Sequence, residues 1–243
     1  MKIAILITTF LRDDLLYNTV KKAIEYSNDD CFILIGDQNP TCIKANFLEE
    51  LSGKLAYYSL PYDCGLSYAR NRLVEVAKTL ECDYILLIAD SLQLCKPLPP
   101  IEHVERLFNQ YPDVGIIGFS INGRKPHPRN IDLIPGKYFY QSIPQNLPYC
   151  DMVSNFFIAK IRCLLDNPWD ENLKLCEHED FFWRLKTKTP WKVIFNNTYS
   201  CDYVKDRSPE YNAMRVRLYG EFQEILRKKY NISEWWRNQS GLY

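Results

Sequence analysis

The chain has 243 residues, of which 47% are apolar and 25% charged, a composition typical of a globular protein with a sizeable core. Thirty basic residues balance thirty acidic ones, so the net charge gives no support for nucleic acid or an anionic membrane as a partner. No apolar run approaches the roughly 20 residues that span a bilayer, so we expect no transmembrane segment.

Nine cysteines are scattered along the chain without a C-x-x-C pair, a pattern typical of buried thiols in a reducing compartment. The N-terminal MKIAILITTF lacks the small-residue cleavage site of a signal peptide and is followed at once by LRDD, so it predicts a first strand. We therefore expect a cytoplasmic protein, or one that lies at the cytosolic face of a membrane.

The first half of the chain alternates apolar, strand-like runs with segments of helical spacing. Strands are predicted over 2–9, 31–37, 54–60 and 83–89, and helices over 13–27, within 39–51 and over 65–80. Asp13 or Asp14 is expected to cap the first helix. This alternation predicts an α/β fold with a mostly parallel central sheet flanked by helices, whose ligands bind beyond the carboxyl ends of the strands.

The second half is less regular. A helix near 101–110 and the strand VGIIGFSI precede a proline-rich excursion over 122–147 with short strands such as KYFYQSI. The strand WKVIFNN and a long helix from about Pro209 to Tyr230 follow. The absence of a linker favours a single domain over 1–243, with a nucleotide-binding half over 1–95 and an acceptor-binding and catalytic half over 96–243.

Several motifs, in their order along the chain, resemble those of inverting GT-A glycosyltransferases of the family-2 type. ITTFLRDDLL resembles the first strand and loop around the nucleotide, LIGDQ the second strand, and YDCGLSYARNRLVEVA the helix start under the diphosphate. YILLIADS stands where that family has an Asp-x-Asp element. EHEDFFWRLK resembles the acceptor and catalytic-base region, closest to the β-1,4-N-acetylgalactosaminyltransferase-like branch. The resemblance covers roughly Ile3 to Tyr219 and implies a GT-A fold.

The resemblance implies a UDP-sugar donor. Asp37, at a strand end, can accept a hydrogen bond from the N3–H of uracil; the alternative is a solvated turn aspartate before Asn39-Pro40. Gly65 permits close approach of a ligand to a helix start, where Arg70 can face the diphosphate. The alternative for Arg70 is a surface ion pair with Glu75 or Asp63. The remaining candidate donor contacts are Thr8, Thr9, Arg12, Asn71, Asp90 and Ser91.

Asp90 ends the apolar strand of the Asp-x-Asp position, but its neighbours are Ala89 and Ser91, so one carboxylate remains. Asp90 can ligate Mn²⁺ or Mg²⁺, with Asp202 as the second candidate ligand and the donor diphosphate completing the shell. Two alternatives stay open: Asp90 only ends the strand, or a cationic side chain neutralises the leaving group without a metal. The candidates for such a cation are Lys205, Arg207 and Arg215.

A general base must take the proton of the acceptor hydroxyl during inversion. The motif CEHEDFFWRLK offers Asp180 first, then His178, then Glu177, at a predicted helix start. Acidic residues also favour helix starts for structural reasons, so that alternative stays open as well.

The resemblance implies an inverting hexosyltransferase that moves a hexose or N-acetylhexosamine from a UDP-sugar to a hydroxyl of a glycan, glycolipid or glycoprotein. A first alternative is a non-catalytic sugar-nucleotide or glycan-binding module with a degenerate metal site, which Ala89 and Ser91 favour. A second is a sugar nucleotidyltransferase, but TTFLRDD lacks the glycine-rich basic loop that such an enzyme needs.

Overall fold

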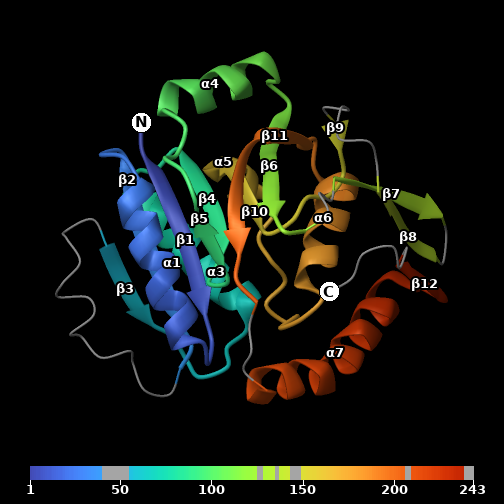
Figure 1. The fold of residues 1–243 in the computed structure, drawn as a ribbon. Coiled ribbons are helices and arrows are strands. Elements are labelled where there is room, and N and C mark those ends of the chain that lie inside the picture. The colour runs from blue at the N-terminus through green and yellow to red at the C-terminus, as the bar shows by residue number, and fades with distance from the viewer. Residues whose placement is uncertain (40–54, 125–127, 135–136, 143–148, 206–208, 238–243) are drawn as a thin grey trace.

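The computed structural model describes residues 1–39, 55–124, 128–134, 137–142, 149–205 and 209–237 (Figure 1). After Asn39, the helix predicted within 39–51 lies outside these residues, and so does Arg207.

In the described residues, a central sheet of nine strands runs in the order β3-β2-β1-β4-β10-β6-β11-β5, with β9 also paired to β11. The strands are β1 Ile3–Thr9, β2 Cys31–Asp37, β3 Leu55–Ser59, β4 Tyr84–Ala89, β5 Leu92–Leu94, β6 Val114–Asn122, β9 Tyr149–Cys150, β10 Phe156–Lys160 and β11 Lys192–Tyr203. The strands β1 to β4 form a parallel block, and β6 pairs β11 in parallel. Antiparallel β10 joins β4 to β6, so the sheet continues from the first half of the chain into the second.

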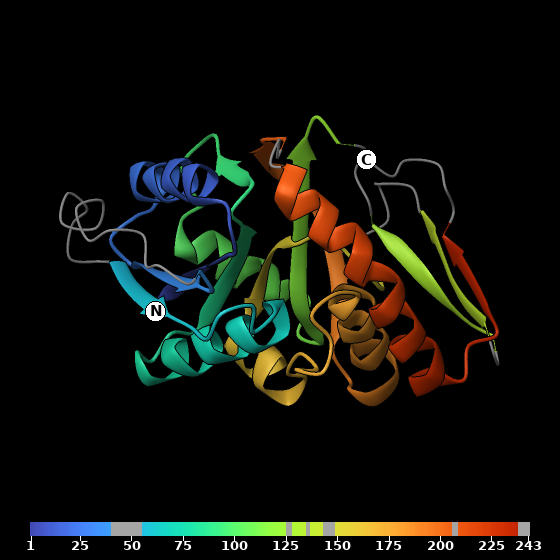
Figure 2. The ribbon, with the colours of Figure 1, turned by 90° about the horizontal axis from the view of Figure 1, so that it is seen from below.

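Helices cover both faces of this sheet (Figures 1 and 2), which confirms the predicted α/β class. On one face lie α1 Asp13–Tyr26 and α4 Ile101–Gln110, and on the other α3 Leu66–Thr79, α5 Ile161–Asp166 and α6 Glu177–Lys188. Because strand side chains alternate, Ile5 of β1 packs on the first face and Leu6 on the second. Both faces of β1 are buried, so the strand is apolar along its length up to Thr8.

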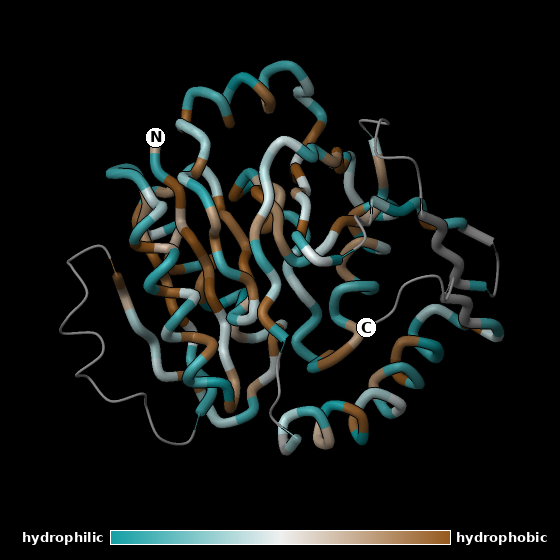
Figure 3. Tube along the Cα trace, viewed as in Figure 1, coloured by the Kyte–Doolittle hydropathy of each residue, from teal (hydrophilic) through white to brown (hydrophobic). Residues whose placement is uncertain are grey.

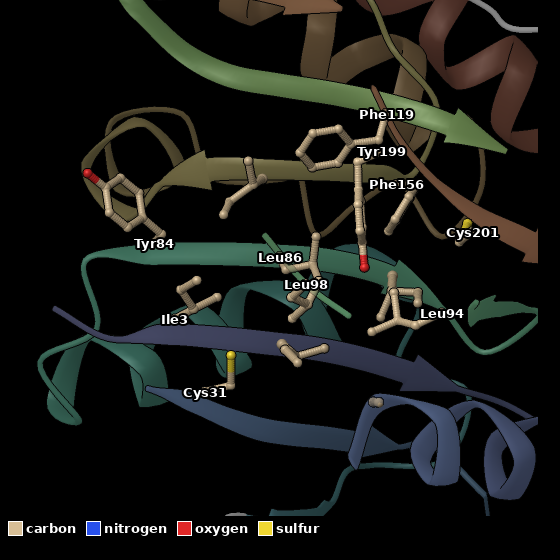
Figure 4. Packing of buried hydrophobic residues seen from close by; sticks show 14 of the residues in the cluster. Ile3, Cys31, Tyr84, Leu86, Leu94, Leu98, Phe119, Phe156, Tyr199 and Cys201 are labelled. Carbon is tan, nitrogen blue, oxygen red and sulfur yellow. The ribbon is translucent and has the colours of Figure 1, made fainter. Parts of the chain in front are cut away.

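The core on the α1 and α4 face joins Ile3 and Leu86 to Phe119, Phe156 and Tyr199 from the second half of the chain (Figure 4). Hydrophobic residues gather in the central strands, whereas the outer helices mix hydrophobic with hydrophilic positions (Figure 3). Six of the eight described cysteines are buried, and all eight are free thiols.

The helix α7 Pro209–Tyr230 passes along the edge at which β1 and β11 end (Figures 1 and 2). Its Phe222 and Leu226 pack on Leu173 and Cys176, in the segment that leads into α6. A second, three-stranded sheet in the order β12-β8-β7 lies at the end of the molecule opposite β3. Its strands are β7 Arg129–Ile134, β8 Lys137–Ser142 and β12 Glu234–Arg237.

The predicted strand over 31–37 and the helices over 101–110 and 209–230 have the bounds that the sequence indicated. The predicted cap of α1 is wrong: Arg12 is the residue before the helix, and no side chain caps it. The Asp13 carboxylate instead accepts a hydrogen bond from the Asn39 side chain at 2.8 Å. No helix in the described ranges has the length and apolar character needed to cross a membrane.

Candidate functional site

Three polar residues meet where the parallel strands β1, β2 and β4 end. Thr9 is aligned with Asp37 of β2, and Thr8 is aligned with Ala89 of β4, so Thr9 lies between Asp37 and Asp90. Thr9 and Asp90 are fully buried, and Asp37 is 1% exposed. Charged groups at such depth are costly unless they are paired, which makes this edge the first candidate for a site.

The Asp37 carboxylate holds the loop after β2. Its Oδ1 accepts the backbone N–H of Asn39 at 2.9 Å, and its Oδ2 accepts the hydroxyl of Tyr57 at 2.5 Å. The Asn39 side chain in turn accepts the backbone N–H of Leu11. Asp37 is therefore not the solvated turn residue of the alternative interpretation. It is a buried carboxylate whose hydrogen bond to Asn39 links the loop after β2 to the loop after β1.

Asp90 is held from three directions. Its Oδ2 accepts the Thr9 hydroxyl at 2.9 Å, and its backbone carbonyl accepts the Thr19 hydroxyl of α1 at 2.6 Å. Its Oδ1 forms an ion pair with Nη2 of Arg12 at 2.5 Å. The guanidinium of Arg12 lies 4.2 Å from the ring centroid of Tyr211, in the first turn of α7.

The second predicted metal ligand has a different partner. Asp202 of β11 is exposed, and its Oδ1 accepts the side-chain amide of Asn122 at 2.8 Å. The neighbouring Ser91 is mostly buried, and its backbone oxygen accepts the N–H of Val204. Within the described parts of the chain, no three His, Cys, Asp or Glu side chains are grouped to hold a metal ion. The donor set at Asp90 thus fits a guanidinium and does not fit a divalent cation.

The start of α3 is packed against the chain. Gly65 has a φ of +88°, and its N–H donates to Oε1 of Gln38 at 2.7 Å. A Cβ at Gly65 would lie 2.8 Å from Cγ of Lys174, so this close approach requires glycine. The Ser67 hydroxyl donates to the carbonyl of Leu173. The helix start that the sequence assigned to the diphosphate therefore also holds the segment before α6.

Arg70 and Asn71 point toward that same segment. Arg70 is buried and pairs with Glu177 at 3.0 Å, and burial lowers the pKa of the guanidinium while Glu177 opposes that shift. The side chain of Asn71 donates to the backbone carbonyl of Trp169 and accepts its N–H. The alternative interpretation of Arg70 as a surface arginine paired with Glu75 or Asp63 is wrong, because its partner is Glu177. Both residues join α3 to the chain around α6.

Asp180 is the most enclosed of the three predicted bases. Its Oδ2 accepts Nε of Arg184 at 2.7 Å, and its Oδ1 accepts both Nζ of Lys229 and the hydroxyl of Tyr230 at 2.6 Å. It is 0% exposed. Its carboxylate therefore joins α6 to the end of α7 and is paired with two cations.

His178 is the partly exposed member of the group. Its Nδ1 lies 2.8 Å from Oδ1 of Asn155. An amide oxygen only accepts, so the tautomer that fits this contact carries the proton on Nδ1 and leaves Nε2 as the basic nitrogen. Burial lowers the pKa of His178 to about 4, against the opposing charge of Glu179 and with help from Arg70 and Arg129. The imidazole is therefore neutral near pH 7.

The partners that complete this edge could not be read from the sequence. Tyr57, Tyr211, Asn155 and Lys229 stand 20 to 199 positions away from the residues they contact, and none belongs to a motif. The longest interval is that from Arg12 to Tyr211. Only the folded sheet and α7 bring them to the site.

The architecture is that of GT-A-type glycosyltransferases, as a comparison with solved structures shows. Staphylococcus aureus TarS, residues 1–349, matches 89% of this chain with a TM-score of 0.60 at 15% identity. The same fragment in complex with UDP-GlcNAc matches 94% with a TM-score of 0.65 at 13% identity. The mannosyltransferase PcManGT from Pyrobaculum calidifontis, in complex with GDP-Man and Mn²⁺, matches 89% of this chain and 60% of its own, with a TM-score of 0.61 at 11% identity.

At these identities the likeness establishes the fold alone. The chain spans 64% of the 1–349 fragment of TarS and 39% of the longer TarS chain. Comparison with models of known protein families gave no match, and neither did comparison with curated proteins.

Proposed function

We propose that this protein is a glycosyltransferase that takes a sugar from a nucleoside-diphosphate donor, with UDP as the preferred nucleotide, and transfers it with inversion to a hydroxyl of a glycan, glycolipid or glycoprotein. The observation that carries the proposal is the buried cluster of Thr9, Asp37 and Asp90 at the carboxyl edge of a GT-A-type sheet. Open α/β sheets bind nucleotides at this edge. The solved neighbours that bind UDP-GlcNAc or GDP-Man support the same assignment.

The base assignment follows from access. A base must come within hydrogen-bond reach of the acceptor hydroxyl. Asp180 is enclosed by three donors, and Glu177 is paired with buried Arg70. His178 is partly exposed and neutral, and its orientation is set by Asn155. We therefore assign the base to His178, and we assign Asp180 and Glu177 to holding α6 in place.

A donor screen tests the proposed function. The purified chain is incubated with UDP-, GDP- and CMP-sugars and a mixed panel of glycan acceptors, and release of the free nucleotide is measured. We expect release from a UDP-sugar, and more of it when a matching acceptor is present. A non-catalytic binding module is the second candidate, because the sole carboxylate of the Asp-x-Asp position is held in an ion pair. Nucleotide binding without release from any donor would support that candidate.

Replacement of Asp37 by alanine should weaken UDP binding by about 10–100-fold, because a hydrogen bond to a charged group contributes about 1.5–3 kcal/mol. Each carboxylate oxygen has two lone pairs, so the bonds from Asn39 and Tyr57 leave capacity for the N3–H of uracil. Calorimetry with UDP and with GDP measures the effect.

Tyr57→Phe is the matched control, since it removes one partner of the same carboxylate and keeps the charge. It should change UDP affinity by a few-fold at most. Equal affinity of the wild-type protein for UDP and GDP would contradict the uracil contact, and so would unchanged UDP affinity in a folded Asp37→Ala variant.

A further inference from the structure

We propose that Arg12 stands in the place of the divalent ion, so that its guanidinium meets the donor diphosphate and nucleotide binding is independent of metal. This inference rests on the proposed function and goes beyond it, because it assigns the positive charge of the donor site to a residue of the chain. The sequence alone suggested Lys205, Arg207 or Arg215 for such a role and suggested Arg12 only as a contact.

The first argument is that Arg12 already occupies the carboxylate a metal would need. Nη2 of Arg12 lies 2.5 Å from Oδ1 of Asp90, and both side chains are largely withdrawn from water, at 11% and 0% exposure. A cation at Asp90 would have to displace the guanidinium or share the site with it. Displacement breaks a buried ion pair, and sharing places two positive centres beside each other, so both are costly.

The second argument is a charge balance. In an Asp-x-Asp element, two carboxylates and one divalent ion sum to zero charge. Here Ala89 and Ser91 flank a lone aspartate, and Arg12 with Asp90 also sums to zero. A divalent ion at Asp90 beside Arg12 would instead give a sum of +2. This chain has one carboxylate fewer than an Asp-x-Asp element, and the monovalent guanidinium of Arg12 in place of a divalent ion restores the charge balance.

The third argument is that the guanidinium is held in position. The chain turns at Leu11, which has a φ of +57° and donates its N–H to Asn39, and this turn delivers Arg12 to the edge of the sheet. Thr9 donates a hydrogen bond to the Asp90 carboxylate, and the guanidinium lies over the ring of Tyr211. A planar, preorganised guanidinium with five N–H donors suits phosphate oxygens well.

Arg12 would then stabilise the negative charge that develops on the nucleoside diphosphate as the bond to the sugar breaks. No proton moves at this residue, since arginine stays charged. The ion pair with Asp90 keeps the guanidinium from extending into solvent when no nucleotide is bound.

The experiment is calorimetric binding of UDP and of uridine to the full chain, in EDTA and in Mn²⁺. The wild-type protein should bind UDP with the same Kd, within about 2-fold, under both conditions. Arg12→Ala should weaken UDP binding by about 10–100-fold in both, because charge-assisted hydrogen bonds to the phosphates are lost, and should leave uridine binding within about 2-fold. A structural defect would weaken both ligands together.

Two further variants keep the test decisive. Arg162→Ala is the control, since Arg162 is a surface arginine with an ion pair to Asp166, and it should change nothing. Tyr211→Leu removes the stacked ring without touching the ion pair and should weaken UDP binding by about 2–5-fold, even where Arg12→Ala fails to fold.

Wild-type binding of UDP that is at least 10-fold tighter in Mn²⁺ than in EDTA would overturn the inference and leave the proposed function standing. Equal UDP affinity in wild-type and Arg12→Ala protein would overturn it too. If neither UDP nor GDP binds under any condition, the proposed function itself fails, and the inference fails with it.

Discussion

Replacing His178 by asparagine should lower kcat by about 10²–10⁴-fold and leave donor affinity nearly unchanged, because the loss of a general base slows the chemical step without removing a donor contact. Asparagine is the most selective substitution, because it removes the basic nitrogen and keeps the hydrogen bond to Asn155. Its amide N–H₂ can still donate to Oδ1 of Asn155 in place of Nδ1, while nothing replaces Nε2. The measurements are turnover with the active donor and acceptor from the screen, and nucleotide affinity by calorimetry.

The matched control is His103→Asn on α4, which lies on the other face of the sheet beside Phe119 and Tyr199. It should leave kcat within about 2-fold. Near-normal turnover in a folded His178→Asn variant would assign the base elsewhere, with Glu179 as the adjacent carboxylate.

The pH profile gives a second readout of the same residue. Burial lowers the pKa of His178 to about 4, so the neutral form persists well below the usual value of 6.5. Only the neutral imidazole accepts a proton, so wild-type kcat/KM should stay level from pH 7 to about 5 and fall near pH 4.

The same depressed pKa of His178 makes stability depend on pH. Because the pKa is lower in the folded than in the unfolded state, the unfolded chain binds more protons between pH 6.5 and 4. Stability should therefore fall as pH falls through that window, less steeply in His178→Asn.

The parallel half of the fold was predictable because its signals are local. The strands β1, β2 and β4 are apolar runs that are buried on both faces, β3 is a partly exposed strand at the edge of the sheet, and the helical spacing after β1 and β3 is strong. The strands β5 and β9 are short and carry no such signal. The antiparallel insertion of β10 between β4 and β6 is a choice of partner, which periodicity does not encode.

Within the candidate site, the sequence predicted which residues share one edge of the sheet but could not assign their partners. Asp37 and Asp90 stand at the carboxyl ends of β2 and β4, the two strands that flank β1, and the carboxyl ends of these parallel strands meet at one edge. Arg70 was expected at the diphosphate, yet its closest charge is Glu177, 107 positions away. Spacing along one helix predicts contacts within that helix, whereas a contact between α3 and α6 depends on how both pack on the sheet.

The Asp180 carboxylate is a junction between α6 and α7. Arg184 belongs to the same helix as Asp180, whereas Lys229 and Tyr230 come from the last turn of α7. The pKa of the Tyr230 hydroxyl is raised mainly by burial and next by the hydrogen bond and charge of Asp180, so the hydroxyl stays a neutral donor. Lys229 also pairs with Asp170 at 2.5 Å, so the junction extends to the loop before α6.

Asp180→Ala should accordingly lower the free energy of unfolding by about 3 kcal/mol, because it leaves two cations and a hydroxyl without their shared acceptor. Tyr230→Phe removes one hydroxyl and should cost about 1 kcal/mol. Denaturant unfolding of both single variants and the double variant forms a double-mutant cycle. The double variant should lose less unfolding free energy than the sum of the two single losses, because the Tyr230 hydroxyl has no acceptor once Asp180 is gone.

Turnover distinguishes this structural role from the role of a general base. At a temperature where Asp180→Ala is fully folded, its kcat should stay far closer to the wild-type value than the kcat of His178→Asn does. A stable Asp180→Ala protein with kcat reduced 10²-fold or more would instead make Asp180 the base, with His178 as the residue that orients the acceptor.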